Sequence, residues 1–93
     1  MTIELHTMLH RHGDLLVQPI DDDLVMADIQ SGKYFGLTDT ARAIWDLLDQ
    51  PATPAAICDA LAESHNVDRA TCEHDVLAFL RDLQGEGLVR AAG

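Results

Sequence analysis

Residues 24–37 read Leu-Val-Met-Ala-Asp-Ile-Gln-Ser-Gly-Lys-Tyr-Phe-Gly-Leu, two apolar runs on either side of a turn signal. Side chains in the first run, Leu24–Ile29, alternate with a period of two, which is typical of a β-strand. Gln30-Ser31-Gly32 favours a turn, and Lys33–Leu37 then resumes the alternation. The stretch therefore predicts two antiparallel strands joined by a short turn.

The residues before this stretch predict one more strand. Leu15–Ile20 is short and rich in apolar residues, and Pro19 near its end is tolerated in an edge strand. Asp21-Asp22-Asp23 then forms a charged turn, which completes a three-stranded antiparallel meander. Residues 1–13 have no clean period, so we expect a flexible N-terminal arm, with room for some extended structure, before a single domain over residues 14–90.

After the strands, the apolar residues recur at spacings of three and four, which is the period of an α-helix. Thr38 is expected to cap a first helix that stops near Asp49, because Pro51 restricts the residue before it. Thr53-Pro54 begins a second helix in the favoured order of cap and proline, and His65-Asn66 ends it.

A third helix follows, capped by Asp68 or Thr71 and closed by Gly85 and Gly87. Leu88-Val89 is expected to dock the tail of the chain. The apolar stripe of this helix consists of Cys72, Val76, Phe79, Leu80 and Leu83.

Strands followed by helices indicate an α+β fold, and this order resembles a winged helix-turn-helix. A chain of 93 residues with 47% apolar residues suits one domain with one core. The longest apolar runs, Leu24–Ala27 and Val76–Leu80, are far shorter than a membrane span, and no apolar signal segment stands at the N-terminus. We therefore predict a cytoplasmic protein.

The charge balance disfavours anionic partners. Sixteen acidic and six basic residues give a net charge of −10, which repels phosphate backbones and anionic lipids. None of the three predicted helices presents a basic face, so neither nucleic acid nor membrane is an expected partner.

No catalytic or metal-binding pattern is found in the sequence. His6, His10 and His12 are read as part of a polar arm, and Cys58 and Cys72 are too far apart for the close ligand pairs of a zinc site. Cys72 and His74 point about 200° apart on a helix, so they cannot form a nucleophile–base pair. We expect two buried thiols and no catalytic residue, metal or cofactor.

The predicted strand Lys33–Leu37 lies at an edge of the sheet if Leu24–Ile29 is the middle strand. An edge strand offers unpaired N–H and C=O groups to an extended peptide. Tyr34 is out of phase with its apolar neighbours, so its ring either borders such a peptide site or only covers the outer face of the sheet. The periodicity alone does not separate these alternatives.

Several segments, in order, resemble the PqqD-like family, the small domains called RiPP recognition elements, where RiPP denotes a ribosomally synthesised and post-translationally modified peptide. The resemblance covers about residues 14–90 and is carried most specifically by residues 31–37 and by Ile44-Trp45 with Leu47-Leu48. It is closer to the stand-alone lasso-peptide branch, the B1 proteins, than to the pyrroloquinoline quinone member. The supporting residues are Asp23–Thr38, Ala41–Leu48, Thr53, Ile57, Leu61, Asp75-Val76, Phe79-Leu80 and Gly87–Val89.

This resemblance implies a non-catalytic domain that binds the leader segment of a precursor peptide. The leader would add as a strand beside the third strand and against the third helix. The implied partners are a transglutaminase-like leader peptidase and an asparagine-synthetase-like cyclase, or alternatively a radical S-adenosylmethionine enzyme. The residues implied by position are Lys33, Tyr34, Phe35, Gly36, Cys72, Asp75, Val76, Phe79 and Asp82.

Two alternatives remain open at this point. A winged-helix regulator that acts through protein contacts or DNA would share the same predicted fold. An exposed edge strand can also pair with a second copy, which would give a dimer in the absence of peptide. If the chain binds a leader peptide, its net negative charge favours a leader that carries Lys or Arg.

Overall fold

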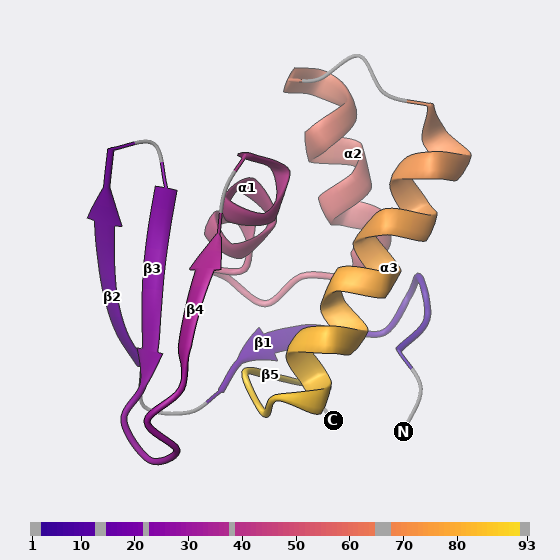
Figure 1. Cartoon of the computed structure of the whole chain (residues 1–93). Helices are drawn as coiled ribbons and strands as arrows, with labels where there is room; N and C mark the ends of the chain where they lie inside the picture. The colour runs from indigo at the N-terminus through magenta and orange to yellow at the C-terminus, as the bar shows by residue number, and fades with distance from the viewer. Residues whose placement is uncertain (1–2, 13–14, 22, 38, 65–67, 92–93) are drawn as a thin grey trace.

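The two strands expected within residues 24–37 lie side by side in the computed structural model, which describes residues 3–12, 15–21, 23–37, 39–64 and 68–91. Among these residues, the predicted α+β order of an antiparallel three-stranded sheet followed by three helices is confirmed (Figure 1). The elements are β1 (Leu9–Arg11), β2 (Leu15–Ile20), β3 (Asp23–Asp28), β4 (Tyr34–Leu37), α1 (Asp39–Leu47), α2 (Pro54–Ser64), α3 (Arg69–Gly85) and β5 (Val89–Ala91).

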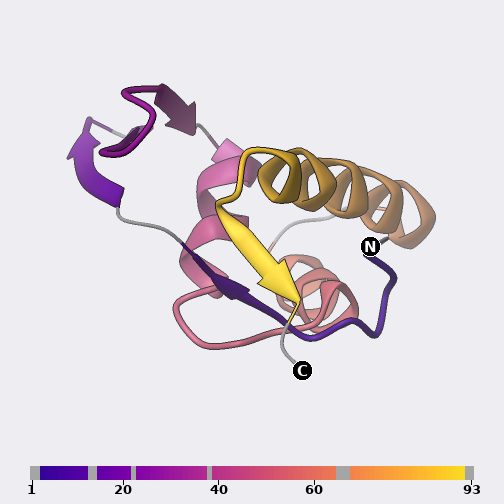
Figure 2. The same ribbon diagram turned by 90° about the horizontal axis from the view of Figure 1, so that it is seen from below.

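The three-stranded sheet has the order β2-β3-β4, so the predicted middle strand is correct. Met26 on β3 lies opposite Val17 on β2 and Phe35 on β4, and all three therefore face the same side of the sheet. Leu24 and Leu37 share that side, which is the side that the core covers. Figure 2 shows this sheet at one side of the molecule, with α1 between it and the other helices.

The turn between β3 and β4 is fixed by its polar residues. The carboxylate of Asp28 accepts the backbone N–H of Gln30, and this bond lowers the pKa of Asp28 below its ordinary value. Gly32 has a φ of 74°, a conformation that glycine adopts without steric cost. The Gln30-Ser31-Gly32 signal thus forms a tight return between the strands.

One apolar core joins the sheet to the helices. Trp45 on α1 and Val76 and Leu80 on α3 are buried in it together with Met26. Residues with helical spacing on α3 share one buried stripe, and Asp68 caps this helix by accepting the backbone N–H of Thr71. The apolar stripe predicted for the third helix therefore supplies much of the core. Its buried members are Cys72, Val76, Leu80 and Leu83.

Residues 3–12 differ from the flexible arm that the sequence suggested. Ile3 and Leu9 are buried, and β1 pairs with β5 in a second antiparallel sheet. Leu9 and Ala52 also exchange two backbone hydrogen bonds, of 2.8 and 2.9 Å. A three-residue strand is too short to show a period, and its partner β5 stands at the other end of the chain. The expected cap Thr38 and the expected helix end His65-Asn66 lie outside the described residues.

Candidate functional site

A groove of about 710 Å³ lies between β4 and the C-terminal half of α3. Phe35 and Phe79 are half-buried and give it an apolar floor, together with the buried Leu37 and Leu83. Tyr34, at the rim, is 77% exposed. The lining residues are Tyr34, Phe35, Gly36, Leu37, Phe79, Arg81, Asp82, Leu83, Gly85 and Glu86.

The outer edge of β4 has no neighbouring strand among the residues that the structure describes, and it borders this groove. The N–H of Asp28 donates to the C=O of Lys33 at 2.8 Å, so Lys33 directs its backbone groups towards β3. Successive residues of a strand direct their backbone groups to opposite sides. Phe35 therefore also faces β3, whereas Tyr34 and Gly36 direct N–H and C=O away from the sheet. These are the backbone groups that an added strand can pair with.

The opposite edge of the sheet is protected. In the register of β2 with β3, Pro19 lies opposite Leu24, and Leu24 directs its backbone groups to β4. By the same alternation, the backbone of Pro19 points outward from the free edge of β2. Proline has no N–H to donate, so a strand added at this edge would lack one backbone hydrogen bond. Strand β4 contains no proline, so its free edge is the one that can accept an added strand.

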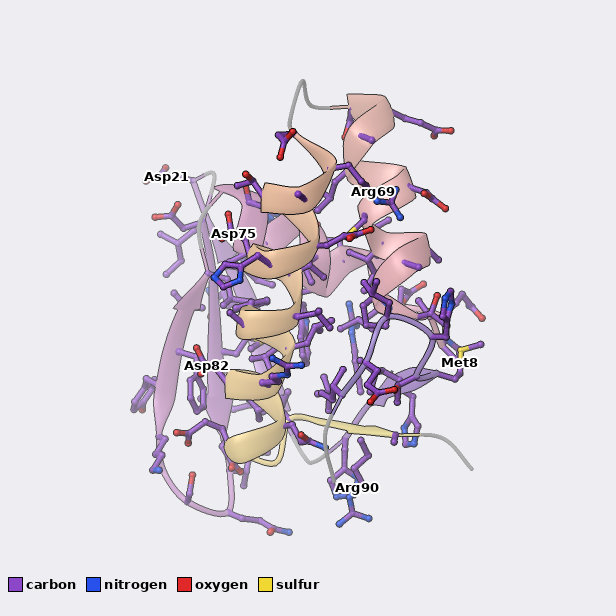
Figure 3. All side chains as sticks on the ribbon, turned by 90° about the vertical axis from the view of Figure 1, so that its right-hand side faces the viewer. Met8, Asp21, Arg69, Asp75, Asp82 and Arg90 are labelled. Carbon is purple, nitrogen blue, oxygen red and sulfur yellow. The ribbon has the colours of Figure 1, made fainter. Side chains whose placement is uncertain are left out.

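The helical wall of the groove carries a stripe of residues spaced by three and four. Asp75, Phe79, Asp82 and Glu86 follow one face of α3 and its C-cap. Figure 3 shows Asp75 and Asp82 on the same side of the helix, two turns apart. On this wall the ring of Phe79 therefore lies between the carboxylates of Asp75 and Asp82.

The charges along this wall are unequally neutralised. Lys33 Nζ lies 3.1 Å from Glu86 Oε2, and Arg81 donates to the backbone C=O of Ile3 at 3.0 Å. Among the residues that the structure describes, Asp75 and Asp82 make no ion pair. An extended peptide in the groove would therefore meet negative charge along the helix.

The sequence model of one protein family, described as coenzyme PQQ synthesis protein D (PqqD), matches residues 23–89 of this chain. The matched segment contains β4, α3 and hence both walls of the groove. The chain belongs to the PqqD family. No curated protein sequence gives a match.

Solved structures agree with this PqqD assignment. The structure "TbiB1 in complex with the TbiA(beta) leader peptide" is 34% identical, with a TM-score of 0.81 over 90% of this chain and 98% of that chain. A lasso peptide synthetase B1 complexed with its leader peptide is 30% identical, with a TM-score of 0.76 over 88% of this chain and 96% of that one. The PqqD truncation of Methylobacterium extorquens PqqCD, described as a stand-alone RiPP recognition element, is 20% identical, with a TM-score of 0.78 over 96% and 95% of the two chains. The last of these shares the fold.

The structure brings five of the nine residues implied by the PqqD resemblance into the lining of the groove. These five are Tyr34, Phe35, Gly36, Phe79 and Asp82. Lys33 stands next to the groove through its ion pair with Glu86, and Asp75 extends the helical stripe towards the N-terminus of α3.

Cys72 and Val76 are not in the groove lining of this PqqD-family chain. They are 6% and 1% exposed and belong to the core stripe of α3. A step of three residues turns a helix by about 300°, so this stripe is only about 60° from the groove stripe. Cys72 instead neighbours Cys58 of α2, and burial, together with the hydrogen bond that the Cys58 thiol donates to Cys72, raises the pKa of Cys58 to about 12.

Sequence reasoning missed the C-terminal part of the groove. Leu83, Gly85 and Glu86 line it, but the pattern assigned Leu83 to the core stripe and Gly85 to the helix end, and it gave Glu86 no role. A spacing of four from Asp82 to Glu86 was the available signal, because it places both on the stripe that carries Phe79.

Neither a metal-binding cluster nor a membrane-spanning helix is present in the described ranges. No group of three or more His, Cys, Asp or Glu side chains there could hold a metal ion. No helix in those same ranges is long and apolar enough to cross a membrane.

Proposed function

We propose that this chain binds the leader segment of a ribosomally made precursor peptide without catalysing a reaction itself. The leader forms a fourth strand on the free edge of β4, and its backbone pairs with Tyr34 and Gly36. Its side chains enter the groove alternately, where Phe35 and Phe79 offer apolar contact. Main-chain hydrogen bonds then provide affinity, and the groove provides selectivity.

The observation that carries this proposal is the unprotected edge of β4 beside an apolar groove. At the other edge of the same sheet, Pro19 removes a backbone donor, so the two edges differ in their capacity to pair with a peptide. Two similar structures, at 34% and 30% identity, hold leader peptides, which supports the same role for this chain.

We further propose that the bound leader delivers its precursor to a modifying enzyme. In the lasso-peptide case, the partners are a transglutaminase-like leader peptidase and an asparagine-synthetase-like cyclase. If the chain instead acts as the pyrroloquinoline quinone member of the family does, the partner is a radical S-adenosylmethionine enzyme. The similarity to two B1 proteins supports the lasso case.

The decisive experiment measures fluorescence anisotropy of a labelled leader peptide from the neighbouring precursor gene. It compares the wild-type chain with Gly36→Pro and Tyr34→Pro, each of which removes one outward N–H from β4. A backbone hydrogen bond contributes about 0.5–1.5 kcal/mol, and the proline ring also obstructs the incoming strand. We therefore expect the affinity to fall by about ten-fold or more.

Val17→Pro is the matched control, because it removes one outward N–H from the β2 edge of the same sheet. Circular dichroism and urea denaturation establish that each variant folds. Equal loss of binding in the β2 and β4 variants, or unchanged binding in both β4 variants, contradicts strand addition at β4. Absence of binding by the wild-type chain contradicts the leader-binding role for that peptide.

A further inference from the structure

The sheet has a second, outward face that the groove does not use. In the register of the three strands, Leu16, Ala27 and Tyr34 form one row across this face, and Gln18, Val25 and Gly36 form the next row. Residues that lie opposite one another project to the same side of a sheet. The outward face therefore presents apolar side chains on all three strands, with Gln18 between Leu16 and Ile20 on β2.

The apolar side chains of this face are exposed at its β2 side. Leu16 is 64% exposed and Ile20 is 51% exposed, in addition to the exposed ring of Tyr34 at the β4 side. Val17, which projects to the opposite side, is also 45% exposed, so β2 is only weakly covered on both faces. Single exposed apolar residues are common, but several exposed apolar residues gathered on one sheet face mark an interaction surface.

Charge at the end of the face restricts what can cover it. Asp23 lies opposite Ile20 on the outward face, and Asp21 precedes it at the tip of the hairpin. Within the described ranges, neither carboxylate makes an ion pair, whereas Lys33 at the other end of the sheet is paired with Glu86. A second copy of this chain, with a net charge of −10, would oppose like charge with like charge.

An added strand is also a poor occupant, because Pro19 removes a donor from the β2 edge. Contact must then be made through side chains, which requires a preformed surface on the partner.

We infer that the outward face docks a folded protein whose contact surface is apolar and is bordered by Lys or Arg residues that meet Asp21 and Asp23. This inference rests on the proposed function in one respect, since it takes the partner to be an enzyme that acts on the leader-borne precursor. Tyr34 belongs both to this face and to the rim of the groove. An enzyme seated on the face therefore lies beside the bound leader without displacing it.

The test titrates the purified leader peptidase and the purified cyclase of the same pathway, separately, against the immobilised chain by biolayer interferometry. The altered chain carries Leu16→Thr and Ile20→Thr, which remove apolar area and place a β-branched residue, suited to a strand, at both positions. The matched control is Met8→Thr. Met8 is also exposed, at 43%, and Figure 3 shows it on the opposite side of the molecule from Asp21.

We expect the double variant to lose about ten-fold or more in affinity for one of the two enzymes, with Met8→Thr unchanged. Leader affinity, measured by anisotropy on the same samples, should stay within about two-fold of wild type because both altered residues lie on β2. Unchanged affinity for both enzymes, or no binding of either enzyme to the wild-type chain, overturns the inference.

Two further outcomes separate the inference from its alternatives. A wild-type dimer by light scattering that becomes monomeric in the double variant shows that a second copy occupies the face, and this also overturns the inference. Enzyme docking is measured with and without leader. Loss of leader binding alone therefore counts against the proposed function, while the leader-free titration still decides whether the face docks the enzyme.

Discussion

Lys33 Nζ lies 3.1 Å from Glu86 Oε2, and this ion pair joins the residue before β4 to the C-cap of α3. The two residues are 53 positions apart in the sequence. The pair therefore holds together the two walls of the groove at one end. It also neutralises Glu86, which leaves Asp82 and Asp75 as the carboxylates that a bound peptide would meet.

Disruption of this pair should have little effect on stability. Both side chains are partly exposed, and such pairs contribute about 0–1 kcal/mol. We expect Lys33→Met and Glu86→Gln each to lower the free energy of unfolding by less than about 1 kcal/mol in urea denaturation. A double-mutant cycle should give a coupling energy that disappears at high salt. A larger coupling that persists at high salt would mean that the pair is effectively buried.

The carboxylates of the groove should accelerate binding of a cationic leader. Asp82→Asn removes one unpaired negative charge from the groove wall, so association of a leader that contains Lys or Arg should slow by about two- to five-fold at low salt. Stopped-flow fluorescence measures this rate. Glu63→Gln is the control, because it makes the same charge change on α2, outside the groove lining. An equal effect of both variants, or no dependence of the rate on salt, contradicts local steering by Asp82.

The central part of the fold could be predicted because its signals are local. Residues 24–37 contain both strands and their turn, and the apolar spacing of each helix stands in one continuous segment. The second sheet could not be predicted in this way. Its strands, Leu9–Arg11 and Val89–Ala91, have three residues each, and they form only when the two ends of the chain meet. Their stability comes from tertiary packing, which no local pattern records.

The packing of the N-terminal segment can be tested through Leu9. This side chain is fully buried, so Leu9→Ala should lower the free energy of unfolding by about 2–5 kcal/mol. A flexible arm would give a change close to zero. Met8→Ala, at the neighbouring exposed position, is the control and should change stability by less than about 0.5 kcal/mol. Equal, small effects at both positions in urea denaturation would support the flexible N-terminal arm that the sequence predicted.

The candidate site could be predicted only in part, for a geometric reason. The alternation of residues 33–37 predicted an edge strand without knowledge of the helices, and the resemblance to the PqqD family then implied residues 34–36 as part of the site. On α3, the core stripe through Cys72 and Val76 and the groove stripe through Asp75 and Phe79 are about 60° apart. Spacing alone cannot decide which of two adjacent helix faces turns towards β4. That decision depends on how α3 packs against α2 and the sheet.

The buried cysteine pair should make stability depend on pH in the alkaline range. Burial raises the pKa of the Cys58 thiol to about 12, whereas a cysteine in an unfolded chain titrates near pH 8.5. Above about pH 8.5 the unfolded chain releases this proton and the folded chain retains it, so the stabilising contribution is complete below that pH and decreases as the pH rises towards 12. Urea denaturation from neutral pH to about pH 10 should show a decline in the free energy of unfolding that is shallower in Cys58→Ala. The same slope in both proteins would mean that the folded chain releases the proton as readily as the unfolded chain. In that case rapid reaction of the native thiol with an aromatic disulfide reagent would follow, whereas we expect reaction only on unfolding.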